Sequence, residues 1–224
     1  MPIPDPGSLL ERLPDAGVSW VRRGDGLVGW GVAAELHVSG NERFSRTQRW
    51  WNTWCREAIV DDPLQIPGSG PVAFGSYTFD PEPASGATSR VIVPRVVLGR
   101  RDGLSWVTVV GDAPTALPPV SVPPAPEYVT WEQGTRSAEE WQQSVSDVIA
   151  RIGRGELDKA VLARDVVAVV GDDFDARYLL QRLAAAYPEC WTFSVAGLYG
   201  ATPELLVRRT GDTVMSRVLA GTVK

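Results

Sequence analysis

The chain has 224 residues and a mass of 24.3 kDa, enough for one large domain or two small ones. Its net charge of −5 and its sequence pI near 5.0 argue against nucleic acid or an anionic membrane as a partner. No apolar run approaches the roughly 20 residues that span a bilayer, and the N-terminus lacks the basic and apolar regions of a signal peptide. We therefore expect a cytoplasmic globular protein.

Two apolar runs near the N-terminus predict a β-hairpin. They cover residues 18–22 and 27–36, and a turn-type cluster at 23–26 joins them. Gly29 and Gly31 interrupt the second run, which indicates a bulge or a close approach of backbone.

A helix pattern follows. From Phe44 to Val60 apolar residues recur at a spacing of three to four, which predicts an amphipathic helix with one apolar face. Asp61-Asp62-Pro63 is expected to end it. Three further strands are predicted, the last two joined by turn residues: 72–79, 90–98 and 104–110.

Six prolines between Ala113 and Pro126 predict an extended segment that is either a linker or a strap over the domain. This segment is the best internal boundary. We therefore expect an N-terminal α+β half over residues 1–112, a connector over 113–130 and a third region over 131–224.

The signals for regular structure are sharper beyond the connector. Ser137 and Glu140 form a capping box that predicts the start of a helix. Residues 160–170 are β-branched and apolar, which predicts a strand buried on both faces. Asp175 is expected to cap a second helix that ends at Pro188. Three more strands are predicted, the last two forming a hairpin: 191–198, 204–209 and 213–218.

The order of these elements predicts the fold class. Strands linked by hairpins, with a few inserted helices, indicate an α+β fold of largely antiparallel β-sheet layers with helices packed outside them. Residues 24–29 have the G-x-G-x-x-G spacing of dinucleotide-binding loops, but they lie in the predicted hairpin and not between a strand and a helix. The phosphate-binding motif G-x-x-x-x-G-K-[ST] does not occur, so a nucleotide site has no support.

The chain has few residues that could act as catalysts or metal ligands. His37 is the one histidine, too few for a histidine-rich zinc site, and its place in a strand pattern favours a surface or pairing role. Cys55 and Cys190 are expected to be buried thiols. Acid–base chemistry would therefore have to use Lys, Glu, Asp or Tyr.

Lys159 and Glu204 are the candidates for such chemistry. Each is predicted at the start of an apolar strand, where partial burial would lower the pKa of a lysine and raise that of a carboxyl group. Such a pair could divide the roles of base and acid near neutral pH. Taken singly, each is explained more simply as an exposed side chain at a strand end.

Three segments in order resemble the chorismate-utilising enzymes. They are Lys-Ala-Val-Leu-Ala-Arg at 159–164, Ala-Thr-Pro-Glu-Leu-Leu-Val-Arg at 201–208 and Leu-Ala-Gly-Thr at 219–222. The family includes isochorismate, salicylate, anthranilate and aminodeoxychorismate synthases. The resemblance implies the fold of that family, with only its N-terminal part present.

Two positions narrow the resemblance to isochorismate synthase. Family members that use water carry a lysine at the position of Lys159, whereas the ammonia-using anthranilate synthases carry a different residue. Ala220 lies where the aminodeoxychorismate enzymes have a lysine nucleophile. The sequence therefore resembles isochorismate synthase most, and salicylate synthase is the second choice. Menaquinone and siderophore pathways both stay open.

The resemblance also implies roles for residues. Lys159 would deprotonate the water that attacks C2 of chorismate, and Glu204 would protonate the departing 4-hydroxyl group. Ala220, Gly221 and Thr222 would line the substrate site, and Mg²⁺ would bridge the substrate carboxylate. The magnesium ligands of the family follow the Leu-Ala-Gly-Thr segment, so they are expected outside this chain.

A base and an acid without the metal site would be half of an active site. We therefore expect residues 1–224 alone to be inactive and to expose apolar surface, with the missing C-terminal half, either cut from the same chain or supplied as a separate one, completing the enzyme. The alternative from a different class is a non-catalytic fragment that binds a partner. The oligomeric state stays open.

Overall fold

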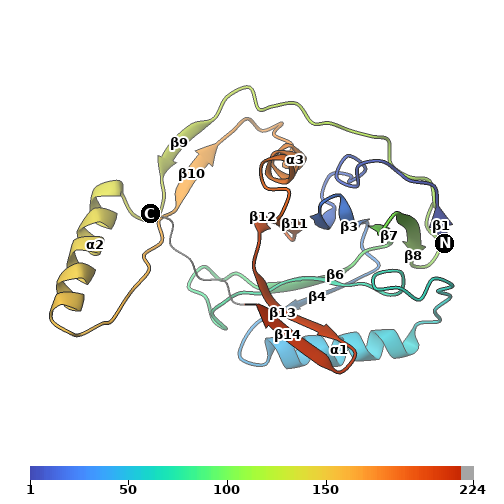
Figure 1. Cartoon of the computed structure of the whole chain (residues 1–224), viewed down its shortest axis with the longest axis horizontal. Helices are drawn as coiled ribbons and strands as arrows, with labels where there is room; N and C mark the ends of the chain where they lie inside the picture. The colour runs from blue at the N-terminus through green and yellow to red at the C-terminus, as the bar shows by residue number, and fades with distance from the viewer. Residues whose placement is uncertain (218–224) are drawn as a thin grey trace. The chain divides into compact units, whose positions relative to one another are not determined.

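The computed structural model describes residues 1–217 and divides into two compact units (Figure 1). The larger unit combines Met1–Pro123 with the chain from Ala176 onward, and the smaller unit is Pro124–Asp175. These boundaries differ from the expected divisions at 112 and 130. The difference arises because strands from the last part of the chain join the sheet that the N-terminal strands build.

A seven-stranded sheet is the framework of the larger unit. Its strand order is β1-β8-β7-β3-β2-β11-β12, and every neighbouring pair is antiparallel. The strands are β1 (Pro2–Ile3), β2 (Val18–Arg22), β3 (Asp25–Trp30), β7 (Val96–Arg101), β8 (Leu104–Val109), β11 (Trp191–Val195) and β12 (Leu198–Thr202). The predicted β2–β3 and β7–β8 hairpins are confirmed, and so is the α+β class.

A three-stranded antiparallel sheet with one helix forms a second layer. The order of its strands is β4 (Ala34–Val38), β6 (Ser89–Val93) and β5 (Phe74–Ser76). Helix α1 (Arg43–Glu57) contacts β4 and confirms most of the predicted helix, but the chain is already extended at Ala58. Arg43 is buried at the start of α1, where its guanidinium donates to the carbonyls of Gly40, Thr78 and Phe79.

The predicted strand over 90–98 is in fact two strands, β6 and β7, which belong to different sheets. The break falls at Pro94, which has no N–H to give to a strand ladder. A Cβ atom on Gly29 would lie 2.7 Å from the Pro94 ring, so this glycine allows the corner to pack against β3. The close approach predicted for this interruption is confirmed.

Two hydrophobic clusters cover opposite faces of the seven-stranded sheet. The first lies against the N-terminal turn and helix α3 (Arg177–Ala186) and consists of Leu9, Leu10, Leu13, Val21, Val28, Val96, Leu98, Val107 and Leu180. The second lies between the two sheets and consists of Val18, Phe74, Ile92 and Val195. Val18 and Val21 point to opposite faces of β2, as strand alternation requires.

The proline-rich segment is a strap over the first cluster. Ala113 and Leu117 pack against that cluster. The N–H of Ser121 donates to the Glu11 carbonyl at 2.8 Å, and Arg12 donates to the Pro118 carbonyl at 2.8 Å. Of the two expected roles, linker or strap, the structure shows the second.

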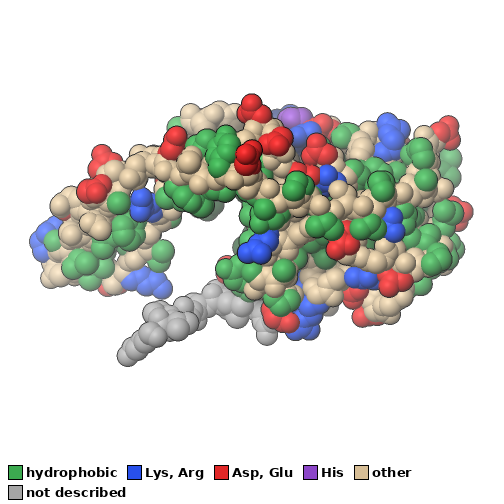
Figure 2. All heavy atoms as spheres, turned by 90° about the horizontal axis from the view of Figure 1, so that it is seen from above, with side chains coloured by type: hydrophobic (Ala, Val, Ile, Leu, Met, Phe, Trp, Pro, Cys, Tyr) green, Lys and Arg blue, Asp and Glu red, His purple; other side chains and the backbone are tan. Residues whose placement is uncertain are grey.

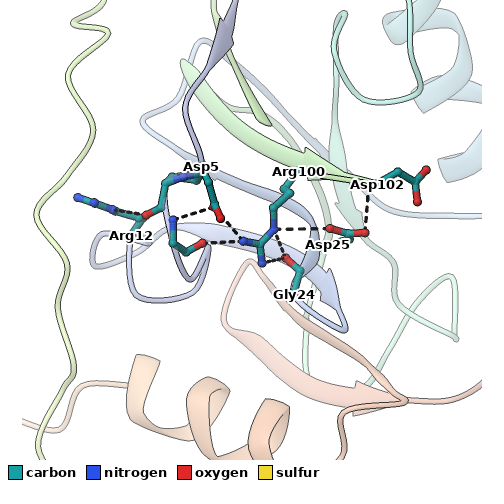
Figure 3. Close-up of polar contacts among 8 residues, drawn as sticks. Asp5, Arg12, Gly24, Asp25, Arg100 and Asp102 are labelled. Carbon is teal, nitrogen blue, oxygen red and sulfur yellow. Dashed lines mark hydrogen bonds and ion pairs between the residues drawn. The ribbon is translucent and has the colours of Figure 1, made fainter. Parts of the chain in front are cut away.

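Arg100 of β7 joins the N-terminal segment to the β2–β3 hairpin at one end of the strands (Figure 3). Its guanidinium donates to the Gly24 carbonyl at 3.0 Å, to the Gly7 carbonyl at 3.0 Å and to the Asp5 carboxylate at 3.2 Å. Asp25 lies 3.5 Å away as an ion-pair partner. The Gly7 N–H and Arg100 together hold the pKa of Asp5 below its usual value. Arg100 therefore fixes the N-terminal segment to both hairpins.

The smaller unit is a two-stranded ribbon that carries one helix. Strands β9 (Thr130–Gln133) and β10 (Val166–Val169) are antiparallel, and α2 (Ala138–Gly153) lies between them in sequence. The predicted capping box is confirmed, since the Glu140 N–H donates to the Ser137 hydroxyl at 3.1 Å and the Ser137 N–H to the Glu140 carboxylate at 2.8 Å.

The strand predicted over 160–170 is wrong in extent and in burial. Only Val166–Val169 is a strand, and residues 160–165 have no regular structure. Within the described residues β10 pairs with β9 alone, and three of its four residues are exposed. An apolar run in a sequence can indicate a buried strand, but the strand is buried only if other segments of the protein pack over it.

The last described element is the hairpin of β13 (Leu205–Thr210) and β14 (Thr213–Arg217), as predicted. It lies beside α1 in the larger unit (Figure 1). Leu205 is half-buried, but the other apolar side chains of β13 and β14 are exposed, with Leu206 at 85% and Val214 at 64%. Figure 2 shows hydrophobic side chains interspersed with acidic and basic ones on the visible face. None of the helices in residues 1–217 has the length and hydropathy needed to cross a bilayer.

Candidate active site

Lys159 lies in the loop between α2 and β10 of the smaller unit. It is exposed and lies outside any regular element. Lys159 and Lys224 are the only lysines in the sequence, whose other basic residues are arginines. A lysine at this position is therefore unusual in a chain that otherwise uses arginine as its basic residue. This rarity of lysine is a second sequence signal for position 159, beside the motif.

Glu204 lies in the larger unit, between β12 and β13. It is exposed, and its backbone N–H donates to the Thr202 hydroxyl at 3.1 Å. This bond and the preceding Pro203 shape the turn, and β13 begins one residue later than predicted, at Leu205.

Lys159 and Glu204 belong to different compact units, Lys159 to the smaller and Glu204 to the larger. Ala220, Gly221 and Thr222 lie outside the described residues 1–217. Their predicted roles stay predictions.

A cavity of about 840 Å³ opens in the larger unit between α1, the second sheet and β13. Phe44 and Trp51 of α1, Tyr77, Arg101 of β7 and Leu206 of β13 are among its lining residues. On the apolar face of α1, Phe44 is 54% exposed and its ring is tilted by 36° against that of Tyr77, with ring centroids 5.0 Å apart.

A second cavity of about 370 Å³ lies at the C-terminal end of α1, against β8. Trp54, Glu57, Asp61, Ser69 and Thr108 are among its lining residues. Neither cavity is lined by Glu204, so the sequence motif and the concave surfaces of the larger unit do not coincide.

The described residues do not fit a magnesium site. No group of three or more His, Cys, Asp or Glu side chains in residues 1–217 is arranged to hold a metal ion. Mg²⁺ prefers carboxylate oxygens among its protein ligands. We therefore assign no reaction step to a metal on this part of the chain.

The remaining titratable candidates are His37 and the two cysteines. His37 is exposed and lies 2.7 Å from the Glu35 carboxylate, which confirms its surface pairing role. Arg90 and then His37 hold the pKa of Glu35 below its usual value. Cys55 and Cys190 are free but only half-buried, less than expected, and burial raises the pKa of Cys55.

The comparisons with known proteins agree on one family. The model of the family described as chorismate binding enzyme matches residues 18–116 and 118–224. A salicylate biosynthesis isochorismate synthase from Pseudomonas aeruginosa is 27% identical over 225 residues, which cover 87% of this chain and 46% of that protein. An isochorismate synthase from Bacillus subtilis is 25% identical over 234 residues, covering 88% of this chain and 49% of that protein.

A solved structure supports the fold. The menaquinone-specific isochorismate synthase from Escherichia coli aligns with 93% of this chain and 50% of its own, with a TM-score of 0.59 and 18% sequence identity. The chain thus corresponds to about half the length of each of these relatives. Because the family model matches nearly all of it, the chain belongs to the chorismate binding enzyme family.

Proposed function

We propose that this chain supplies the acid–base residues of an isomerase that converts chorismate to isochorismate. One observation carries the proposal: the family match extends over 118–224, the stretch that holds both Lys159 and Glu204. The names of the relatives from Pseudomonas aeruginosa and Bacillus subtilis support this reaction within the family.

The proposed reaction adds one water and releases another. The neutral amine of Lys159 takes a proton from water while the water oxygen forms a bond to C2 of chorismate. The ring double bonds shift, the C4–O bond breaks, and Glu204 gives its proton to the departing hydroxyl group. Transfer of a proton from the lysine back to the carboxylate restores the starting state, so the net change is an isomerisation.

This chemistry requires the two side chains to be covered during turnover. Desolvation favours a neutral lysine and a protonated carboxyl group, which are the forms that can act as base and acid. Both residues are exposed in the described structure. We propose that the substrate and a polypeptide corresponding to the other half of the relatives cover them, either in the same chain or as a separate one.

Ala220, Gly221 and Thr222 are proposed to line the substrate site, where the glycine permits close approach of the backbone to the ring. Mg²⁺ is kept as a proposed requirement of the complete enzyme. Its ligands would have to come from outside residues 1–217, because the described residues lack a suitable cluster. The cytoplasmic location also stays a proposal.

The test is product formation from chorismate with Mg²⁺ by the complete protein that contains residues 1–224. Lys159→Arg keeps the charge but removes a usable base, and Glu204→Gln removes the proton donor. Each is expected to lower kcat by at least about 100-fold, whereas Lys224→Arg serves as a matched control and should leave it unchanged.

The products separate the alternatives. Isochorismate accumulation supports the proposal, while salicylate and pyruvate would identify a salicylate synthase. Full activity of Lys159→Arg or Glu204→Gln would remove that residue from the mechanism and favour a non-catalytic scaffold role. Robust isochorismate formation by residues 1–224 alone would refute the requirement for a second half.

A further inference from the structure

Hydrogen bonds and ion pairs restrain both ends of the loop that carries Lys159, and each set of these contacts is called a tie below. It runs from Arg154 to Asp165 and has no regular structure after its first turn (Figure 1). Such a loop samples many conformations, so a side chain at its centre has no fixed position unless contacts restrict the backbone.

The first tie lies at the C-terminal end of α2. The Glu156 carboxylate accepts from Arg151 at 3.0 Å and from Arg154 at 2.6 Å. These ion pairs fold the start of the loop back on the last turn of the helix. All three side chains are exposed, so each pair stabilises the turn only modestly.

The second tie lies just before β10 and is the more specific one. The Asp165 carboxylate accepts the Thr135 N–H with both oxygens at 3.0 Å and the Thr135 hydroxyl at 3.0 Å. Arg164 also donates to the Gln133 side chain at 2.9 Å. These bonds extend the β9–β10 pairing past its last backbone pair, Val166 and Gln133.

Gly134 makes this contact possible. A Cβ atom at this position would lie 2.5 Å from both a carboxylate oxygen and the carbonyl oxygen of Asp165, closer than real Cβ atoms approach. A glycine is therefore required where the two segments meet. The bonds from Thr135 also hold the pKa of Asp165 below its usual value, so the carboxylate stays ionised and available as acceptor near neutral pH.

We propose that Asp165 and Thr135 are positioning residues that fix the end of the Lys159 loop and so present the lysine amine at a defined place. The meaning of this placement rests on the proposed role of Lys159 as base. The fixation itself can be measured without any turnover.

The chain offers a direct probe of loop order. A lysine-specific endoprotease can cut residues 1–224 internally at one bond, Lys159–Ala160, because Lys224 is the last residue. Cleavage requires the segment around the bond to open and extend, so the rate follows the population of opened loop. Asp165→Ala should raise this rate about tenfold, the effect of losing a charge-assisted bond cluster.

Matched variants isolate the contact. Thr135→Val keeps the N–H but removes the hydroxyl and should give a smaller increase, whereas Thr135→Ser should match the wild type. Asp147→Asn is the control, because it removes the same charge from a surface bond to Gln143 on α2. Cleavage by an arginine-specific protease, scored only at bonds in the larger unit because Arg154 and Arg164 lie in the loop itself, measures any general loosening of the fold.

Support for the proposal is a rise in lysine-specific cleavage that arginine-specific cleavage does not share, in Asp165→Ala and in the milder Thr135→Val. Equal lysine-specific rates in these variants and the wild type would overturn it, and so would a parallel rise with both proteases. Neither protease result depends on chorismate. The activity of Lys159→Arg toward chorismate tests the proposed function separately, whether that variant is active or inactive.

Discussion

Replacing Gly99 by alanine tests how Trp106 packs on the seven-stranded sheet. Gly99 on β7 pairs directly with Trp106 on β8. A Cβ atom at residue 99 would lie 2.8 Å from the indole nitrogen and closer still to two ring carbons. The ring cannot move aside freely, because it is 1% exposed and donates to the Gly68 carbonyl at 3.1 Å.

The size of the effect follows from these contacts. Overpacking a filled site costs about 1–3 kcal/mol, and loss of the indole hydrogen bond adds about 1 kcal/mol. The lower backbone entropy of alanine in the unfolded chain offsets about 0.5–1 kcal/mol. Gly99→Ala should therefore lower the free energy of unfolding by about 1–3.5 kcal/mol, or Tm by roughly 2–14 °C.

Urea unfolding followed by circular dichroism measures this change. In a Trp106→Leu background the ring is gone, so adding alanine at residue 99 should cost little or stabilise the protein. The difference between the two backgrounds is the coupling between the residues. An equal cost of Gly99→Ala in both backgrounds would refute the clash between residue 99 and Trp106. A rise in the free energy of unfolding on Gly99→Ala in the native background would show that the space beside Gly99 is not filled.

Two further predictions concern polar contacts. Arg100→Lys keeps the charge but loses the forked hydrogen bonds to Gly7 and Gly24, so the free energy of unfolding should fall by about 1–2 kcal/mol in urea unfolding, and no change would show that these bonds are dispensable. The Ser69 hydroxyl and nearby N–H groups hold the pKa of Asp62 below its usual value, and Thr135 does the same for the pKa of Asp165. A depressed folded-state pKa gives stability that is present above the unfolded value and lost as pH falls through the folded one, so Tm should drop below about pH 4. The drop should be shallower in Asp62→Asn and Asp165→Asn, and identical pH curves would contradict the linkage.

Local signals in the sequence predicted local structure well. The capping box at Ser137 and the turns of the hairpins depend on residues a few positions apart, and the structure has them as expected. The helix over Arg43–Glu57 also follows its apolar spacing. Each of these features is determined by hydrogen bonds or contacts within one short segment.

The failures concern contacts between distant segments. The run at 160–170 is apolar enough for a buried strand, but within the described residues only β9 pairs with it. The break at Pro94 separates two sheets that no spacing rule distinguishes. The pairing of β11 with β2 joins residues more than 160 positions apart, which moved the unit boundary to Pro124 and Asp175.

The family could be predicted from the sequence, but the arrangement of the candidate residues could not. The motifs around Lys159 and Glu204 pointed to the family that the comparisons show. Nothing in the spacing of the sequence indicated that the two residues lie in different compact units. The ties around the lysine loop were also missed, although Gly134 and Asp165 flank the ribbon where an extended pairing would begin.

The central claim is that Lys159 is the base in the conversion of chorismate to isochorismate. Its most direct test is the rate of isochorismate formation by the complete protein with Lys159→Arg, set beside Lys224→Arg under the same conditions. We expect a loss of at least about 100-fold in kcat for the first variant and no loss for the second. Isochorismate formed by Lys159→Arg at the wild-type rate would contradict it.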